Sequence, residues 1–451
     1  LKLRVSYGEV GNDGINSSLW SQNWEATSDK RYQGAVNGAF LPSYSLGADM
    51  ANKDLKWETT ITRNIGVDFG FFNSRLTGTI DAYWNTTKDL LMKTAIPGIT
   101  GFTSTYANVG QTSNKGIEIA LQGVLVKTRD WNVTAGFNIN FNRGKVDKLA
   151  DNVTGLYGTE WATSSTFPKS DYVLKEGRPV GLVRGLTADG FYTTDDFTYE
   201  NGVYILKEGV ADVSSAVFPN YHLHNGMNER PAGQLAYPGM AKFKDLNDDG
   251  IINDDDVDVI GDMTPVHTGG FNINATYKNF DLGLYFNWSY GNEIYNVNKL
   301  AALYGYKEGA VYENKLSIVK DCYKIYDVVN GELVALTTPE QLNAANANAK
   351  LPLAYSENGY VSTLGIEDGS YLRLNTLTLG YTLPKSMLQK AGISNLRVYG
   401  SIYNVFTITG YSGIDAEVST STSTKTYPQL GMDWGTYPRA RSFVLGVNLS
   451  F

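Results

Sequence analysis

The sequence predicts an all-β protein, an antiparallel transmembrane β-barrel segment of about ten strands with long extracellular loops. At the end of the chain, Phe443, Leu445, Val447 and Leu449 alternate with residues that are mostly small or polar. A period of two is typical of a β-strand, and a tilted strand of about ten residues crosses a bilayer. Similar stretches recur upstream, and the connections between them alternate between short and long. Taken alone, the last stretch would also suit an edge strand of a soluble sandwich.

The alternating pattern places the predicted strands. The clearest are WNVTAGFNINF from Trp131 and FDLGLYFNWSY from Phe280, in which every second residue is apolar or aromatic. Aromatic residues at the ends of such faces are expected at the membrane interfaces. In chain order, the predicted strands lie near 1–7, 57–71, 75–85, 116–126, 131–142, 266–277, 280–290, 369–381, 396–408 and 442–451.

The connections between these strands indicate the topology. Tight turns are predicted around Asn73, Arg129 and Asn279, and a somewhat longer connection starts at Pro384. An antiparallel barrel alternates in this way when one side carries short periplasmic turns and the other carries long external loops. The long connections cover 8–56, 86–115, 143–265, 291–368 and 409–441. The stretch 143–265 must then contain an even number of crossings or none, and Gly181–Tyr192 is a candidate strand within it.

Composition argues against several other classes of protein. The chain has 451 residues with 47 Gly and 30 Tyr, and its net charge of −8 argues against nucleic acid as a partner. It contains no run of about 18 apolar residues, so we expect no transmembrane helix. Cys322 is the only cysteine, which leaves no internal disulfide. The strand spacing is too irregular for a propeller or solenoid, and Gln341–Lys350 predicts a short helix or ordered loop element.

Several strings along the chain match one known family in that family's order. They are LKLRVSYGEVGNDGI from Leu1, DLKWETT from Asp54, NIGVDFGFFNSRLTGTIDAYW from Asn64, IPGITGFTSTYANVGQTSNKGIEI from Ile96, KFKDLNDDGIINDDD from Lys242, DGSYLRLNTLTLGYTLP from Asp368, NLRVYGSIYNVFTIT from Asn395 and GTYPRARSFVLGVNLSF from Gly435. Together they resemble the C-terminal barrel half of SusC/RagA-like TonB-dependent outer-membrane transporters of Bacteroidetes-type bacteria. The resemblance spans nearly the whole chain.

The resemblance implies a 22-stranded barrel in the bacterial outer membrane with an N-terminal plug domain in its lumen. Residues 1–451 would then be the C-terminal part of the barrel, and LKLRVSY at Leu1–Tyr7 already alternates like a strand where a signal peptide would stand. Because ten strands cannot close at that diameter, we expect the chain to pair with an N-terminal plug and barrel portion, as a separate chain or a missing segment. The family also implies a SusD-like surface lipoprotein as lid, TonB acting through the N-terminal part, surrounding membrane lipid and a dimer of transporter–lipoprotein pairs.

The sharpest local motif is an acidic loop, DLNDDGIINDDD from Asp245. It fits a twelve-residue calcium loop in which Asp245, Asn247 and Asp249 offer side-chain oxygens and Ile251 offers its carbonyl. Gly250 allows the sharp turn, and the twelfth position holds Asp256 where the pattern has glutamate. Calcium here would be a structural clip on an extracellular loop, which would reduce the conformational entropy of that loop. An acidic turn without an ion is the alternative.

Candidates for enzymatic chemistry are few, and we expect no enzyme. His222 and His224 form an H-x-H pair without a recognisable third metal ligand, and His267 opens a predicted strand, where it would face the rim or the lumen. Asp195 and Asp196 are adjacent carboxylates, but glycoside hydrolysis needs two carboxylates at a defined separation in space. No nucleophile-elbow, zinc-protease or P-loop motif is present.

Aromatic residues outside the predicted strands are candidates for a binding vestibule. Aromatic rings stack on sugar faces or hold peptide side chains, and tyrosine also forms hydrogen bonds. The alternative is that they pack the loops against each other, and the segment around Trp434 is expected to be structural because it leads into the last strand. These residues are Trp20, Trp24, Tyr32, Phe40, Tyr44, Trp161, Tyr304, Tyr306, Tyr411, Tyr427, Trp434 and Tyr437.

The resemblance implies TonB-dependent active import of oligosaccharides or oligopeptides across the outer membrane. Solute captured with the lipoprotein would enter the barrel, and energy from the inner membrane would move the plug. A passive porin or structural barrel is the first alternative and would conduct steadily without energy coupling. An outer-membrane hydrolase and an adhesin are the other two. The hydrolase would need converging acid and base groups on the rim.

Overall fold

The structure is a computed structural model of the 451-residue chain. It describes all residues except 13–18, 23, 28–33, 38, 42, 48, 151–152, 163–165, 218–229, 304–315, 355–358, 389–391 and 421–428. The chain divides into two compact units, and each is described by itself. Unit 1 contains residues 1–156, 175–180 and 269–278, and unit 2 contains residues 157–174, 181–268 and 279–451.

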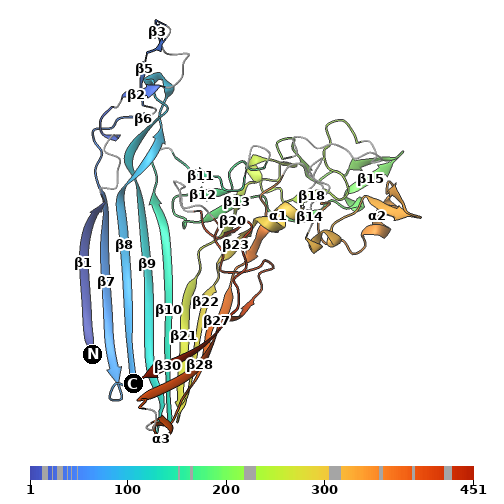
Figure 1. Cartoon of the computed structure of the whole chain (residues 1–451). Coiled ribbons are helices and arrows are strands. Elements are labelled where there is room, and N and C mark those ends of the chain that lie inside the picture. Colours follow the sequence, from blue (N-terminus) through green and yellow to red (C-terminus); the bar gives the residue numbers. More distant parts are fainter. Residues whose placement is uncertain are drawn as a thin grey trace. The chain divides into compact units, whose positions relative to one another are not determined.

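Unit 1 is built on long antiparallel strands that lie side by side in Figure 1. Their hydrogen-bonded order is β1-β7-β8-β9-β10-β21, which follows the order of the chain. The strands are β1 (Lys2–Asn12), β7 (Glu58–Phe71), β8 (Leu76–Ala95), β9 (Ser104–Lys127), β10 (Trp131–Lys148) and β21 (His267–Tyr277). Five shorter strands lie in the connection between β1 and β7. These are β2 (Trp24–Thr27), β3 (Ala35–Val36), β4 (Ala39–Phe40), β5 (Ser43–Leu46) and β6 (Asp49–Met50).

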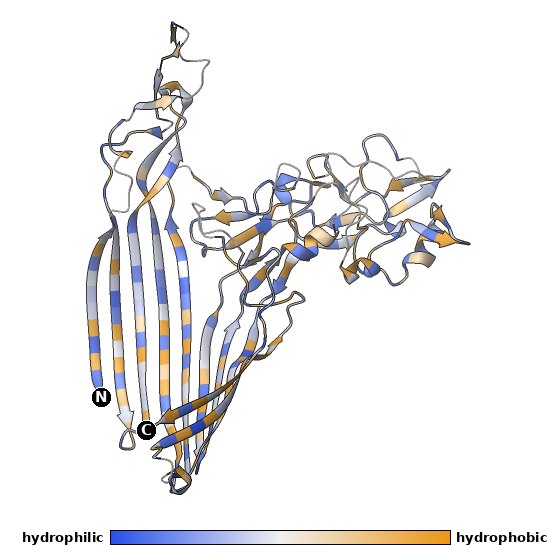
Figure 2. Cartoon of the chain, in the orientation of Figure 1, coloured by the Kyte–Doolittle hydropathy of each residue, from blue (hydrophilic) through white to orange (hydrophobic). Residues whose placement is uncertain are grey.

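The alternation in the sequence sets the two faces of these strands. Leu3, Val5 and Tyr7 of β1 point to one side and are exposed, while Arg4 and Ser6 between them point to the other. Figure 2 shows the same alternation of hydrophobic and hydrophilic residues along the long strands. We call the side that carries Arg4, Asp68, Asp81, Glu118 and Asn140 the polar face, because these residues lie opposite one another in the strand register or bond directly.

Unit 2 contains a second run of long antiparallel strands, in the order β22-β27-β28-β30. These are β22 (Phe280–Tyr290), β27 (Tyr371–Thr382), β28 (Asn395–Thr409) and β30 (Ser442–Ser450). The ladders are shifted in two places, between Tyr285 and Phe286 and between Leu374 and Thr376. A short helix, α3 (Lys385–Leu388), lies in the connection between β27 and β28.

The long connections of unit 2 fold together into what we call the loop module, residues 157–174, 181–266, 291–370 and 410–441. Its strands are short and pair in small sheets. They are β11 (Leu156–Gly158), β12 (Tyr172–Leu174), β13 (Leu182–Gly185), β14 (Ala188–Phe191), β15 (Phe197–Glu200), β16 (Val203–Leu206), β17 (Asp212–Val213), β18 (Ala241–Phe243), β19 (Ile251–Ile252), β20 (Asp258–Asp262), β23 (Glu293–Asn296), β24 (Tyr326–Val329), β25 (Glu332–Ala335), β26 (Ile366–Asp368) and β29 (Met432–Asp433). Its helices are α1 (Val297–Leu303) and α2 (Pro339–Asn346).

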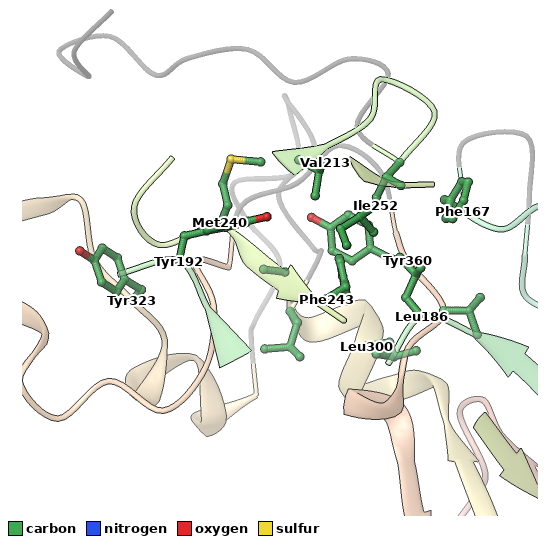
Figure 3. Packing of buried hydrophobic residues seen from close by; sticks show 14 of the residues in the cluster. Phe167, Leu186, Tyr192, Val213, Met240, Phe243, Ile252, Leu300, Tyr323 and Tyr360 are labelled. Carbon is green, nitrogen blue, oxygen red and sulfur yellow. The ribbon is translucent and has the colours of Figure 1, made fainter. Parts of the chain in front are cut away.

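The loop module has a hydrophobic core of its own. Tyr192, Leu186 and Leu300 are fully buried; the first two lie in the connection between β10 and β21, and Leu300 lies in the connection between β22 and β27. Figure 3 shows that buried side chains far apart in the sequence, from Phe167 to Tyr360, pack together in this core. Phe243 and Tyr360 meet edge to face, with ring centroids 5.4 Å apart. The module is therefore held by side-chain packing as well as by its short strands.

The structure confirms the ten predicted strands and corrects the connections between them. Residues 86–95 and 104–115, predicted as part of a long loop, extend β8 and β9, so that only 96–103 connects them. They lack simple alternation because the ladder is interrupted near Leu90, where Asp89 has a φ of 58°. The candidate strand at Gly181–Tyr192 forms β13 and β14, which pair within the loop module. The helix expected at 341–350 is α2. Among the described residues, none of the helices combines the length and apolar character needed to span a membrane.

Candidate functional site

Arg4 joins three strands on the polar face of unit 1. Its Nε donates to Asp68 of β7 at 3.0 Å, and its Nη1 donates to Asp81 of β8 at 2.8 Å. Gly66 lies between them on β7, opposite both Arg4 and Asp81 in the register. A Cβ at Gly66 would lie 2.3 Å from the Asp81 carboxylate and 2.7 Å from the guanidinium. Glycine at this position therefore leaves the space through which the arginine reaches across a strand.

Unit 2 contains the same arrangement with a different set of strands. Arg397 of β28 donates from Nε to Asp281 of β22 at 2.8 Å, and Gly380 of β27 lies between them. The Arg397 guanidinium also stacks on the ring of Tyr399 at 4.7 Å. Alternation in the sequence predicts which face these residues share. It does not reveal the pairs, because the partners are more than 60 residues apart in each case.

The polar face of unit 1 is rich in amides and carboxylates. Glu118 of β9 lies opposite both Asp81 and Asn140 in the register. Tyr83 donates its hydroxyl proton to Asn142 at 2.8 Å, passing over a glycine of β9. Amides both donate and accept hydrogen bonds, so this face is suited to polar surfaces such as peptide groups or sugar hydroxyls.

A cluster of two arginines and two carboxylates fastens residues 410–441 to the long strands of unit 2. Arg373 of β27 is 2% exposed and donates to Glu417 at 2.9 Å and to Asp415. Arg439 donates to the same Glu417 oxygen at 2.8 Å and lies 3.4 Å from Asp415. The two positive and two negative charges balance: Arg373 and Asp415 are buried, and Glu417 and Arg439 are exposed beside them. We call these four residues the ionic square.

A hydrogen bond to Asp433 closes the same segment on itself, and hydrogen bonds to Glu367 tie it to the rest of the loop module. Tyr411 donates its hydroxyl proton to the buried Asp433 at 2.7 Å, and burial raises the pKa of Tyr411 well above its usual value. Glu367 accepts from the backbone and hydroxyl of Ser412 at 2.9 and 2.8 Å. Burial alone would raise the pKa of Glu367, but these bonds and Lys299 outweigh burial and lower it. These residues position loops and bring no acid–base pair onto a substrate site.

The acidic loop forms a tight turn anchored in the core. Asp245 accepts from the backbone N–H of Asp249 at 3.2 Å and of Gly250 at 2.7 Å, and Gly250 has a φ of 84°. Asp256 is fully buried and accepts from the N–H groups of Leu246 and Asn253 at 2.7 and 2.8 Å. Oxygen ligands of this kind suit calcium. Across the described residues, however, no group of three His, Cys, Asp or Glu converges as a metal site.

The other predicted ligands of that loop have local roles. Asn247 accepts from the N–H of Asp249 at 3.1 Å, and Asp249 accepts from the N–H of Ile251 at 2.9 Å. Ile251 pairs with Asp212 in a parallel bridge between β17 and β19. In this arrangement the side-chain oxygens of the loop are bonded to its own backbone, and a calcium ion would have to replace several of those bonds.

Of the candidate histidines and adjacent acids, those within the described residues make structural contacts. His222 and His224 lie outside the described residues. His267 opens β21, and its Nδ1 accepts from Trp288 Nε1 at 3.0 Å while its ring stacks on Tyr290 at 4.9 Å. These contacts put His267 beside the aromatic residues of β22 at the strand end.

The pair Asp195–Asp196 has a structural role at the surface of the loop module. Asp196 completes a capping box with Thr193 and pairs with Lys242 at 2.7 Å. Burial would raise the pKa of Asp196, but the bonds from Lys242 and Thr193 lower it. Sequence analysis also missed Asp171, a fully buried carboxylate that accepts three backbone N–H groups of residues 160–162. A lone aspartate before a strand gives no local signal of that role.

The structure divides the predicted aromatic residues into two groups. Tyr411 is buried and Trp161 packs against the core of the loop module, so these two hold the loops together. Tyr32, Tyr304, Tyr306 and Tyr427 lie outside the described residues, as does the side chain of Phe40. The exposed members are Trp20, Trp24, Tyr44, Trp434 and Tyr437. Among the aromatic residues that the structure describes, this exposed group has rings available to a solute.

Comparison with known proteins identifies the family. The family model described as "TonB dependent receptor-like, beta-barrel" matches residues 1–405. TonB-dependent receptor P3 of Formosa agariphila is 30% identical over 459 aligned residues, which cover 100% of this chain and 39% of that protein. TonB-dependent receptor SusC of Bacteroides thetaiotaomicron is 28% identical over 460 aligned residues, covering 100% of this chain and 37% of SusC.

Solved structures agree on the fold. The structure of the RagAB peptide transporter matches with a TM-score of 0.69 and 24% identity, covering 100% of this chain and 40% of that chain. The chain thus spans about 40% of the length of the curated relatives that it matches. The chain belongs to the TonB-dependent receptor β-barrel family of integral outer-membrane proteins, which includes its relative SusC.

Proposed function

We propose that this chain forms part of the barrel of a TonB-dependent importer that takes up oligosaccharides or oligopeptides with a SusD-like surface lipoprotein. The observation that supports this most is the match of the family model over residues 1–405, together with alignment of the entire chain to SusC. The amide-rich polar face, with Glu118 and Asn140, offers hydrogen-bonding groups to a polar solute. On this proposal the chain performs no covalent chemistry.

Energy coupling separates this proposal from a passive porin. The test is uptake of fluorescent oligosaccharides and fluorescent oligopeptides by cells that produce the full-length protein, with and without a protonophore. We expect the protonophore to abolish uptake of one of the two solutes. Uptake that persists, accompanied by steady conductance in planar bilayers, would favour the porin. Turnover of either solute by the purified protein would favour the hydrolase.

We propose the hairpin β24–β25 as a contact for the lipoprotein. Val328 and Leu333 are opposite one another in this hairpin and are 65% and 69% exposed. Exposed apolar pairs of this kind are typical of protein contact sites. The hairpin lies in the connection 291–370, which is extracellular in the predicted topology, where a surface lipoprotein would meet it. The choice of a lipoprotein as the partner rests on the resemblance of the chain to SusC/RagA-like proteins.

Co-purification tests this contact. The double change Val328→Glu and Leu333→Glu is expected to reduce the amount of lipoprotein recovered with the full-length protein at least several-fold. The matched control is Asp327→Asn with Glu332→Gln, two polar changes in the same hairpin. Unchanged recovery with the glutamate pair would remove the hairpin from the interface without affecting the transport proposal.

We further propose calcium as a structural ligand of the acidic loop, through Asp245, Asn247, Asp249, the carbonyl of Ile251, and Asp256. The turn at Gly250, with its φ of 84°, supports the proposal, since this loop pattern needs a sharp turn at its sixth residue. Calcium at about 100 times its Kd would raise the free energy of unfolding by about 2.7 kcal/mol. Calorimetric titration should show binding that Asp245→Asn with Asp249→Asn abolishes and the surface change Asp195→Asn leaves intact. Absence of binding up to millimolar calcium would contradict the proposal.

A further inference from the structure

The last strand, β30, has a sequence that does not by itself fix its alignment with β28. Phe443, Leu445, Val447 and Leu449 alternate with other residues along the strand. A slip of one residue would turn these side chains to the opposite face, but a slip of two residues would keep all of them on the same face. The observed register nevertheless pairs Tyr399 with Gly446 and Val398 with Val447. Something other than the apolar pattern must select it.

The first selecting contact is the ring of Tyr399 over Gly446. A Cβ at Gly446 would lie 2.3 Å from Cζ of that ring. Any side chain at position 446 would therefore have to displace the ring. The ring is held in turn by the guanidinium of Arg397, which stacks on it at 4.7 Å and bonds to Asp281. A two-residue slip would bring Val444 or Asn448 under the ring in place of glycine.

The second selecting contact is at the other end of the strand, where the chain enters β30. Asn404 of β28 has a φ of 53° and donates its side-chain N–H to the carbonyl of Arg439 at 3.0 Å. Nε of Arg441 donates back to the carbonyl of Asn404 at 3.3 Å. The side chain of Arg439 is itself held in the ionic square by Glu417 at 2.8 Å. A slip of two residues would pull Arg439 out of these bonds.

We propose that these contacts form a two-point register lock, defined as Gly446 under Tyr399 and Arg439 between Asn404 and the ionic square. Each point alone disfavours the slipped alignments, one by steric exclusion and the other by lost hydrogen bonds and ion pairs. Register is the quantity that a barrel must keep constant, because the stagger of its strands determines its diameter. The lock is independent of which solute the protein transports.

Disulfide trapping in the full-length protein in outer membranes tests the lock. The background carries Cys322→Ser, since Cys322 is the only native cysteine. The pair Val398→Cys with Val447→Cys reports the native register, and Val398→Cys with Leu445→Cys or with Leu449→Cys reports slips of two residues. With the lock intact, we expect the native pair to form at least about tenfold faster, because directly opposite Cβ atoms lie about 4.5–5.5 Å apart and diagonal ones about 7–8 Å.

Breaking the lock should change which pair forms. Gly446→Val with Arg439→Ala and Asn404→Gly removes the close fit under the ring, the ion pairs of Arg439 and the bond from Asn404 to the carbonyl of residue 439. This variant is expected to raise cross-linking of a slipped pair several-fold and to reduce that of the native pair. The matched control is Gly400→Val, because a Cβ there meets only Leu445, at 3.4 Å. If the slipped pairs stay as slow as before while the native pair forms normally, the lock is wrong.

A second variant keeps the proposal testable if Gly446→Val prevents assembly. Tyr399→Ala removes the ring that requires glycine, so Tyr399→Ala with Gly446→Val should restore both assembly and native-register cross-linking. Failure of this double variant to assemble, when Tyr399→Ala alone assembles, would show that Gly446 is needed for a reason other than the ring and would overturn the steric half of the lock.

Discussion

The long strands and the loop module place their apolar side chains in opposite surroundings. Leu445 of β30 is 88% exposed and Leu3 of β1 is 68% exposed, whereas Leu300 and Tyr192 of the loop module are 0% exposed. A strand in an outer-membrane barrel turns its apolar residues to lipid, which provides the apolar surroundings. The loop module meets water and must bury its apolar residues against one another. The same residue type therefore has a different energetic role in each region.

Shortening a leucine in each region is the strongest test of this difference in energetic role. Leu300→Ala should lower the free energy of unfolding of the loop module by about 2–5 kcal/mol, because it leaves a cavity in a close-packed core. Leu300 also packs against Gly365, where an added Cβ would lie 2.6 Å from its side chain. The measurement is the rate of limited proteolysis of the loop module against denaturant concentration, with the full-length protein in lipid.

The matched control is Leu445→Ala. Lipid chains can fill the space left on an exposed strand face, so we expect Leu445→Ala to lower the free energy of unfolding much less. Denaturant unfolding of the strands, with the full-length protein in lipid, measures this loss. Equal losses for the two variants would mean that Leu445 is packed against protein, and the contrast between the two regions would fail.

Introducing a charge should produce the opposite ranking. Leu445→Arg places a guanidinium on the lipid face and should cost about 2–4 kcal/mol near the bilayer midplane, less near an interface. Val328→Arg, on the exposed hairpin β24–β25, should change stability by no more than about 0.5 kcal/mol. Denaturant unfolding in liposomes measures the first, and proteolysis of the loop module measures the second. A large loss from Val328→Arg would show that the hairpin is covered.

The regions also differ in how far the sequence predicts them. Period-two alternation predicted all ten long strands. One face of each strand is apolar and the other is polar, so apolar and polar residues alternate in the sequence. It failed at residues 86–115, where Asp89 interrupts the ladder and Asn108 donates to its carbonyl at 2.7 Å. Once a strand no longer has one lipid face and one polar face, simple alternation no longer marks it.

The candidate sites were predicted less well than the strands. The acidic loop is recognisable because its residues are consecutive, and its turn at Gly250 is where the motif requires it. The ionic square joins residues 373, 415, 417 and 439, and the Arg397–Asp281 pair spans 116 positions. Such contacts depend on which strands are neighbours and on the exact register. No local pattern of residue types contains that information.

Two tyrosines of the last loop, the buried Tyr411 and the exposed Tyr437, test the difference between buried and exposed aromatic residues. Tyr411→Phe removes a 2.7 Å hydrogen bond to the buried Asp433 and should cost about 1.5–3 kcal/mol, the range for bonds to charged groups. Tyr437 is 87% exposed, and Tyr437→Phe should leave stability unchanged. Thermal unfolding of the loop module measures both. If Tyr437 lies on the path of the solute, Tyr437→Ala will alter uptake while stability stays constant.

The smallest expected effect concerns two glutamates on neighbouring strands of the loop module. Hydrogen bonds from Ser412 and Lys299 lower the pKa of Glu367, whereas burial raises the pKa of Glu293 despite a bond from the N–H of Asp262. A lowered carboxyl pKa gives stability above the unfolded value of about 4.3, and that stability is lost as the pH falls through the folded pKa. A raised pKa has the opposite sign, so stability falls as the pH rises from about 4.3 through the folded pKa.

Glutamine at each position separates the two signs. At neutral pH, Glu367→Gln should lower the free energy of unfolding by about 1–2 kcal/mol. The difference from the unmodified protein should shrink only below about pH 4.3, as the pH falls through the folded pKa of Glu367. Glu293→Gln should raise it at neutral pH, by an amount that shrinks as the pH falls toward 4, because the amide keeps an acceptor for Asp262 without a charge to bury. Unfolding curves from pH 8 down to about pH 2 measure both. Parallel curves for the two variants would mean that both glutamates have similar surroundings, and the opposing pKa shifts would then be wrong.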